Sequence, residues 1–267
     1  VDDALEELKQ QVRKAPANPD LRGFLYQLFL VKGEWDRALS QLDAIGSLDP
    51  GRSVELQVTR TAIECERARA RVFAKGSPPF VHGPAQKWMS DLLQANIHFA
   101  AGRIDQACAL RDQALEAAPA TPGTLDGTPF QWLSDTDHRL GPVLECFVRG
   151  QYMWVPFNTL VSVRIEEPKF IQNTLWANAV VTWSDGSAAA ILLPARYPGL
   201  PDGRLGPDDL HLLGRATSYE AFGDPETGLV IGVGQKVIAS DVDDYPLLAV
   251  RTLEFHGTID PDETRSL

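Results

Sequence analysis

The 267-residue sequence is poor in the features that mark secreted, redox-active or membrane-embedded proteins. Its three cysteines, Cys65, Cys108 and Cys146, are widely spaced and form no C-x-x-C pair, which favours reduced thiols in the cytoplasm over zinc or redox chemistry. No run of 18 apolar residues occurs, so we expect no bilayer-spanning segment. The first residues, Val1-Asp2-Asp3, are acidic rather than apolar, so we expect no secretory signal there.

The common catalytic signatures are missing as well. The sequence contains no G-x-S-x-G, H-E-x-x-H or Walker P-loop, so hydrolase and NTPase chemistry have no motif support. Gly232-Val-Gly234 is similar to the start of a dinucleotide loop, but it lies in an apolar strand-like run and lacks the third glycine. The motifs therefore predict no catalytic residue, no cofactor and no metal.

Basic residues are scarce in the second half of the chain. Residues 1–120 carry 15 Lys and Arg against 16 Asp and Glu, whereas residues 121–267 carry 10 against 20. Because nucleic acids are bound through cationic side chains, this distribution argues against a nucleic-acid ligand. A basic or amphipathic protein partner fits an acidic surface better. The chain is 44% hydrophobic and 23% charged, as in globular proteins, and is long enough for one large or two ordinary domains.

The sequence does contain an internal repeat. LVKGEWDRA at 30–38 matches FAAGRIDQA at 99–107, an offset of 69 residues, and Pro50 and Pro119 keep this offset. The offset is about twice the 34-residue period of tetratricopeptide repeats. Gly33 and Gly102 fall where two helices reverse direction, and each proline falls where the second helix ends. We predict helices near 2–14, 19–32, 35–47, 52–74, 85–101 and 104–118, with residues 51–84 as a degenerate unit.

Stacked repeat helices leave a concave surface that accepts an amphipathic helix or an extended peptide. Arg22 and Tyr26 fall on helix faces that suit such a surface, and they are candidate partner contacts. The alternatives are ordinary helix packing for Tyr26 and a solvated side chain for Arg22. Arg67 and Arg71 share one helix face, with Arg69 turned away, which predicts a solvated, salt-bridged surface.

After Pro119 the sequence changes character. Residues 120–129 are dense in turn formers and are predicted to link a helical domain, 1–119, to a β-rich domain, 130–267. The expected strands are 143–149, 152–157, 160–165, 179–183, 188–194, 230–239 and 247–255, with a short helix at 168–176, loops over 196–228 and a frayed tail from 257. The predicted fold class is α+β, with tetratricopeptide-like helical repeats followed by an antiparallel β-rich domain.

The most informative segment is 130–168, FQWLSDTDHRLGPVLECFVRGQYMWVPFNTLVSVRIEEP. It contains D-x-D-x-R-L-G-P-V-L-E at 135–145, G-x-Y-x-W-V-P-F at 150–157 and I-E-E-P at 165–168. These pieces resemble the signature of the ImpE-type accessory proteins of bacterial type VI secretion. LPARYPG at 193–199, GRAT at 214–217 and VRTLEF at 250–255 resemble further family elements. The first of them resembles the family's P-x-R-Y-P-G-S element, in which Leu200 here replaces the usual serine.

The resemblance extends over both halves and implies a non-catalytic cytoplasmic adaptor. It implies that the partner is a short amphipathic helix at the amino terminus of the small sheath subunit. Binding would modulate sheath assembly or the recycling of sheath by an AAA+ ATPase, which would contact this protein at most indirectly. The binding groove belongs either to the repeats or to the seam between the two domains, and we favour the seam because the signature segment directly follows the expected linker.

Two interpretations are open for the polar residues of the signature. Asp135, Asp137 and His138 lie within four residues and suit a divalent metal or acid–base catalysis, so the alternative function is a metal-dependent or acid–base enzyme. The sequence offers no spaced partner ligand such as H-x-x-x-H, and Asp137 can pair with Arg139 in a turn. We therefore favour a structural role or a partner contact for these residues.

The aromatic residues of the segment also have two interpretations. Large rings either fill the core of a β domain or stand exposed as interface anchors. Taken together, the predicted partner-binding residues are Arg22, Tyr26, Trp132, Asp135, Asp137, Arg139, Tyr152 and Trp154.

Overall fold

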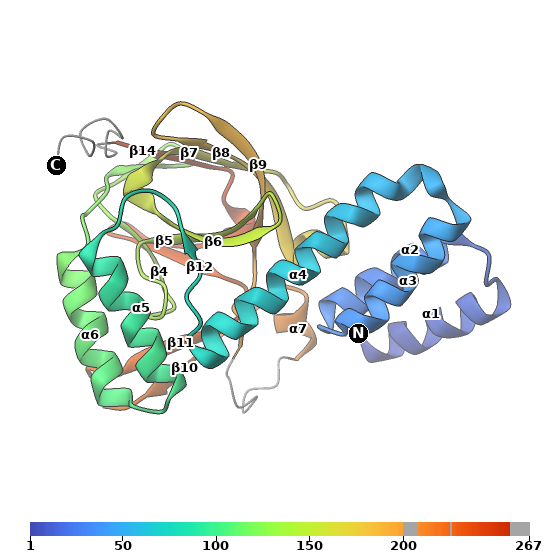
Figure 1. The fold of residues 1–267 in the computed structure, drawn as a ribbon, viewed down its shortest axis with the longest axis horizontal. Helices are drawn as coiled ribbons and strands as arrows, with labels where there is room; N and C mark the ends of the chain where they lie inside the picture. The colour runs from blue at the N-terminus through green and yellow to red at the C-terminus, as the bar shows by residue number, and fades with distance from the viewer. Residues whose placement is uncertain (200–207, 225, 257–267) are drawn as a thin grey trace.

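The computed structural model describes residues 1–199, 208–224 and 226–256. The helices in these ranges are α1 (Asp2–Lys14), α2 (Pro19–Val31), α3 (Trp35–Leu48), α4 (Ser53–Lys75), α5 (Lys87–Ala100), α6 (Ile104–Ala117) and the short α7 (Asp209–Leu212). The first six begin and end close to the predicted positions. In Figure 1, α1 to α3 lie at one end of the molecule and α5 and α6 at the other, and α4 runs between them. Within the described ranges, no helix is both long and apolar enough to cross a bilayer.

The two repeat copies fold alike. Gly33 has a φ of 71° and Gly102 a φ of 72°, the left-handed conformation that glycine adopts without strain. In both turns the residue after the glycine donates its backbone N–H to a carbonyl five residues earlier, at 2.9 Å. Ala38 and Ala107, at matching positions, are fully buried where the paired helices approach. The repeat predicted from the sequence is therefore confirmed as two equivalent helix pairs, α2–α3 and α5–α6.

The degenerate unit expected at 51–84 contains one long helix, α4, in agreement with the single helix predicted near 52–74. Helix α4 has 23 residues and is about 35 Å long at 1.5 Å per residue. It follows a 3₁₀ turn at Pro50–Arg52 and ends at Gly76, whose φ is 63°. No glycine or proline interrupts residues 53–75, so nothing reverses the chain before Gly76. The two helix pairs are consequently bridged by α4 rather than stacked into one array (Figure 1).

Most of the strands form one large sheet. They are β1 (Phe80–Val81), β2 (Gly123–Leu125), β3 (Thr128–Phe130), β5 (Val143–Val148), β6 (Gln151–Pro156), β7 (Leu160–Ile165), β8 (Trp176–Trp183), β9 (Ala188–Pro194) and β14 (Thr252–Phe255). Their order is β1-β6-β5-β9-β8-β7-β14-β2-β3, and every pair is antiparallel except β1–β6. The remaining strands are β4 (Leu133–Asp135), β10 (Thr217–Phe222), β11 (Leu229–Gly234), β12 (Val237–Ser240) and β13 (Asp244–Pro246). They form a β10–β11 pair and a β13-β12-β4 sheet.

Several sequence predictions for this half need correction. Residues 120–129, expected to be a linker, hold β2 and most of β3, because Asp126 (φ 48°) and Gly127 (φ 83°) form a tight reversal. The strand expected at 230–239 is two strands, β11 and β12, since Gly234 (φ 92°) breaks the run. The region 196–228, expected to be loops, contains α7 and β10.

Two other predicted elements are shorter than expected. The helix predicted at 168–176 is a 3₁₀ turn at Ile171–Thr174, after which β8 begins. The strand predicted at 247–255 opens with a 3₁₀ turn at Leu247–Ala249 and is extended only in β14. Leu200 and the tail from 257 lie outside the described residues.

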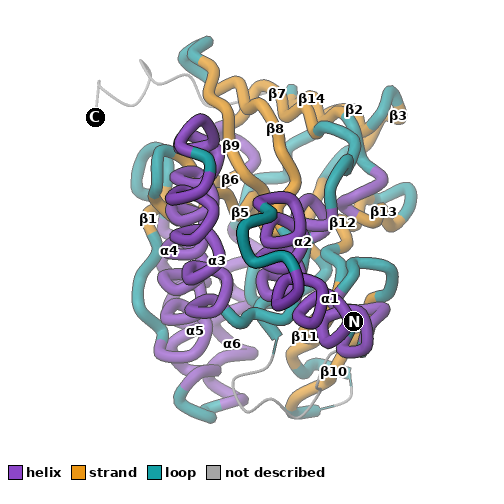
Figure 2. Tube along the Cα trace, turned by 90° about the vertical axis from the view of Figure 1, so that its right-hand side faces the viewer, coloured by secondary structure: helices purple, strands orange, loops and turns teal. Residues whose placement is uncertain are grey.

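Helices and sheet share one hydrophobic core. Trp154 and Trp176 from the strands are buried in the same cluster as Tyr26 and Phe73 from the helices. The rings of Trp35 on α3 and Trp176 on β8 stack with centroids 6.3 Å apart. Figure 2 shows α3 to α6 gathered along one side of the molecule, with the strands above and beside them. The boundary between helical and β-rich sequence is thus a packed interface.

Candidate functional site

The structure buries most of the residues predicted to contact a partner. Six of the eight have at most 3% of their surface exposed: Tyr26, Asp135, Asp137, Arg139, Tyr152 and Trp154. Arg22 is half-buried and donates to the Pro16 carbonyl and the Gln41 side chain, whereas Trp132 is 41% exposed. A buried side chain offers a partner no surface, so direct contact fits only Arg22 and Trp132. The other six residues hold the fold together.

Asp137 and Arg139 form a closed, buried ion pair. The Asp137 carboxylate accepts two bonds from the guanidinium, at 2.9 and 2.6 Å, and one from the Arg139 backbone N–H at 3.0 Å. It also accepts the backbone N–H of Gly232 at 3.0 Å, which ties the signature segment to β11. The Arg139 guanidinium lies over the Phe73 ring of α4, 4.7 Å from its centroid. The pair therefore joins strand β11 and helix α4 through one turn.

A second group of buried charges joins α4 to the sheet. We call Glu66, Arg69, Asp135, Glu145 and Lys236 the buried charge cluster. Arg69 on α4 donates to both oxygens of Glu145 on β5, at 2.8 and 2.9 Å. Lys236 lies 2.6 Å from Glu145 and 2.8 Å from Asp135. Trp176 on β8 also bonds to α4, since its indole N–H donates to Glu66 at 2.9 Å.

The pKa values in the buried charge cluster follow from this pairing. Burial alone would raise the pKa of the Glu145 carboxyl, but Arg69 and Lys236 hold it well below its usual range. Burial raises the pKa of Asp135, a shift that Lys236 opposes. Burial, together with the neighbouring Glu145, raises the pKa of Tyr152 well above its usual value, so its hydroxyl stays protonated and donates to Glu145. Each of the three carboxylates lies against Arg69 or Lys236, as buried ions need an opposite charge beside them.

The three residues of the proposed metal or acid–base cluster, Asp135, Asp137 and His138, bond to other side chains. Asp135 accepts from Lys236, Asp137 accepts from Arg139, and the His138 ring contacts Arg111 instead of either carboxylate. The His138 Nδ1 atom accepts the backbone N–H of Val230 at 3.1 Å. Across residues 1–199, 208–224 and 226–256, no group of three His, Cys, Asp or Glu side chains could hold a metal ion. The alternative function loses its geometric support.

We expect His138 to make the protein less stable in mild acid. Burial, together with the adjacent Arg111, lowers the pKa of the ring below its ordinary 6.5. The unfolded chain therefore takes up this proton before the folded chain does, so stability falls as the pH drops below about 6.5. Thermal unfolding from pH 7.5 to 5 should show a falling midpoint, and His138→Gln should make the fall shallower. The pKa of His82 is also lowered by burial, so part of the slope should remain.

The matched control for this measurement is His256→Gln, at an exposed position. It should keep the pH dependence of the unchanged protein. If the unfolding midpoint depended on pH equally with and without His138, the pH dependence could not be assigned to this residue.

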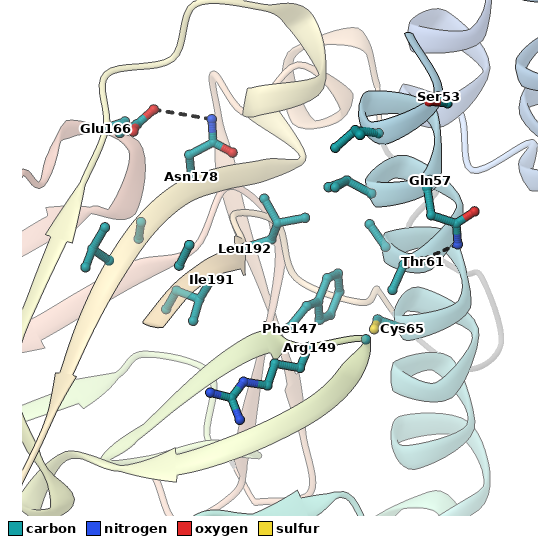
Figure 3. A pocket seen from close by; sticks show the side chains of 17 residues that line it. Ser53, Gln57, Thr61, Cys65, Phe147, Arg149, Glu166, Asn178, Ile191 and Leu192 are labelled. Carbon is teal, nitrogen blue, oxygen red and sulfur yellow. Dashed lines mark hydrogen bonds between the residues drawn. The ribbon is translucent and has the colours of Figure 1, made fainter. Parts of the chain in front are cut away.

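An open groove lies between α4 and the sheet. Its volume is about 890 Å³. Helix α4 contributes Ser53, Val54, Gln57, Val58 and Thr61, and the facing strands contribute Phe147, Asn178, Val180, Ala190 and Leu192. Figure 3 shows α4 along one side, β8, β9 and the β5–β6 turn along the other, and Cys65 and Phe147 between them. The groove therefore lies on the seam between helical and β-rich sequence.

The groove is lined mainly by uncharged side chains. Val54 is 77% exposed and Val58 51% exposed, and these residues lie one helical turn apart. Of the lining residues, Arg149 and Glu166 carry charge. Burial raises the pKa of the Cys65 thiol to about 11, so it lines the groove as a neutral apolar group. Exposed apolar side chains concentrated in a concavity mark an interaction site.

The sequence analysis missed these groove residues. The signal available was a second apolar stripe on α4, Val54 and Val58, on a face other than that of Leu56 and Ile63. A second signal was the turn at Arg149-Gly150, because arginine stands there at a position where hairpin turns favour asparagine. Neither signal shows by itself that the two features meet in one groove.

Comparisons with known proteins agree with the repeat and the signature. The family model described as ImpE protein matches residues 127–254, and a tetratricopeptide repeat model matches residues 1–57. The chain is 42% identical over 258 residues to the type VI secretion system accessory component TagJ of Pseudomonas aeruginosa, covering 97% of this chain and 88% of that protein. None of these descriptions names a catalytic activity.

The fold is also that of a solved structure. The crystal structure of protein VPA1032 from Vibrio parahaemolyticus matches with a TM-score of 0.86 and 22% identity, covering 96% of this chain and 93% of that one. At this identity the match concerns the fold alone. Through its signature segment and its full-length similarity to TagJ, the chain belongs to the ImpE family.

Proposed function

We propose that this protein is a non-catalytic, cytoplasmic adaptor of type VI secretion that binds an amphipathic helix in the groove between α4 and the sheet. The occupant is the amino-terminal helix of the small sheath subunit. Its binding modulates sheath assembly or the ATPase-driven recycling of sheath. The observation that carries the proposal is the exposed apolar groove on the seam, in a family with an accessory component of type VI secretion among its members.

The shape of the groove favours a helix as its occupant. One wall is itself a helix, with exposed Val54 and Val58 and half-buried Thr61 at the four- and three-residue spacing of one helix face. A second helix laid along such a wall buries an apolar stripe of its own, as in other helix-in-groove complexes. The small side chains Thr61, Ala62 and Ala190 let backbones approach closely.

The energetics fit a reversible modulator. The groove exists before the partner arrives, so the protein pays little ordering entropy, whereas a helix that folds on binding loses about 2–5 kcal/mol of its interaction energy. Micromolar affinity, about −8 kcal/mol, is the expected range. Binding should bury apolar surface and so give a negative heat-capacity change.

The test is calorimetric titration with a synthetic peptide that covers the small sheath subunit's amino-terminal helix. We expect saturable micromolar binding, and we expect Val58→Asp to weaken it at least about tenfold, roughly 1.4 kcal/mol, because a carboxylate would then face the apolar stripe. Ala70→Asp is the matched control, since it adds the same charge at an exposed position of α4 outside the groove. Absence of binding up to millimolar peptide would exclude the sheath-subunit helix as the partner. Equal effects of Val58→Asp and Ala70→Asp on the affinity would exclude this groove as the binding site.

A further inference from the structure

Arg149 occupies a backbone position that does not suit arginine. It is the first of two residues in the turn between β5 and β6, with a φ of 48°, and Gly150 follows with a φ of 81°. Two-residue hairpin turns with positive φ at both positions favour Asn-Gly. A residue with a Cβ atom, other than Asn or Asp, is strained there, and strain that persists in a fold is a reason to look for function at that residue.

In the described part of the chain, the guanidinium of Arg149 is also without a partner. It is exposed, and among the described residues it makes no hydrogen bond or ion pair, whereas Arg69 and Arg139 are fully paired. In Figure 3 its side chain extends from the turn away from α4, on the strand side of the groove. An arginine that stabilised the turn itself would bond to it, so the turn does not account for this residue.

The other charged lining residue, Glu166, cannot neutralise it. Strand pairing aligns Glu166 with Asn178, Asn178 with Leu192, and Leu192 with Phe147, across β7, β8, β9 and β5. Glu166 is thus three strand spacings from β5, roughly 14 Å at about 4.8 Å per spacing. Its carboxylate accepts instead from the Asn178 amide at 3.3 Å. The groove therefore presents one uncompensated cation.

We propose that Arg149 recognises a carboxylate on the bound helix and so fixes the orientation of that helix in the groove; this rests on the function proposed above. An arginine fork binds a carboxylate through two parallel hydrogen bonds, which sets direction as well as attraction. The chain has a net charge of −11, so an acidic side chain on the partner is repelled from most of its surface. The occupant should therefore carry an Asp or Glu beside its apolar stripe, at the end that lies over the β5–β6 turn.

Arg149→Asn separates this role from any role in folding. Asparagine followed by Gly150 is the pair that the turn favours, so the variant should unfold at the same temperature as the unchanged protein or higher. Its affinity for the sheath-subunit peptide should nevertheless fall about tenfold or more, because a charge-assisted, bidentate contact is lost. Arg164→Asn is the control, since Arg164 on β7 is an exposed arginine that does not line the groove.

The partner side of the contact is tested by replacing each acidic residue of the peptide, one at a time, with its amide. One such replacement should weaken binding to the unchanged protein as much as Arg149→Asn does, and should have no further effect on Arg149→Asn. The role of Arg149 would be overturned if Arg149→Asn left the affinity unchanged. It would also be overturned if the losses of binding free energy from Arg149→Asn and from each amide replacement in the peptide were fully additive. Either result would leave the groove assignment in place. No binding to the unchanged protein would overturn the proposed function and this inference with it.

Discussion

Glu145→Ala should lower the free energy of unfolding by about 3–5 kcal/mol, the usual effect of removing one partner of a buried ion pair. The substitution leaves Arg69 and Lys236 facing each other with 2% and 3% of their surfaces exposed. Asp135 and Glu66 remain nearby, but neither makes a two-bond contact with Arg69 as Glu145 does. The Tyr152 hydroxyl also loses its acceptor.

Chemical denaturation and thermal unfolding measure this loss. At about 2–4 °C per kcal/mol for a chain of this size, the unfolding midpoint should fall by about 6 °C or more. Glu167→Ala, at an exposed position after β7, is the matched control and should change the free energy by less than about 0.5 kcal/mol. A Glu145→Ala protein as stable as this control would mean that the buried charge cluster does not hold α4 to the sheet.

The helices could be predicted because their signals are local. A new helix begins shortly after Gly33 and after Gly102, and a helix ends shortly before Pro50 and before Pro119. These helix boundaries are therefore determined by residues within a few positions of them. The longer strands of the large sheet, β5 to β9, could be found from β-branched and aromatic runs for the same reason. The strands β4 and β13 were missed because three residues carry little pattern. The strand β10 has six residues, but none of them is buried, so it lacks the alternation of buried and exposed positions that marks a strand.

The site residues were harder, because burial is a property of the whole fold. The pattern of α4 separated Arg69 from Arg67 and Arg71, yet it could not show that the separate face meets Glu145, 76 residues later in the chain. The same limit applies to Trp154 and Tyr152, whose rings suit a core and an interface equally well. The core interpretation is confirmed for both residues, while Trp132 remains exposed. The seam location of the groove depends on packing that no local pattern encodes.

Asp137→Ala should be about as destabilising as Glu145→Ala, by about 3–5 kcal/mol, for a reason that concerns the family signature itself. Asp137 is fully buried and is the ion-pair partner of Arg139, which is 2% exposed. Its removal leaves that guanidinium and the Gly232 N–H without their acceptor. On this view the D-x-D-x-R run is retained to join the turn to β11 and α4.

A double-mutant cycle with Arg139→Met distinguishes this structural role from a catalytic or partner-binding one. Removing both charges together should be less damaging than the sum of the single changes, by about 1–3 kcal/mol, because neither ion is then left buried alone. Unfolding free energies for the two single variants and the double variant, measured in urea, give this coupling directly. If the Asp137→Ala variant were fully stable but no longer bound the sheath-subunit peptide, Asp137 would have to contact the partner directly. The protein would then have to expose this buried side chain on binding. If stability falls and the coupling appears, Asp137 holds the signature turn against β11 and α4, and recognition is left to Val54, Val58 and Arg149 in the groove.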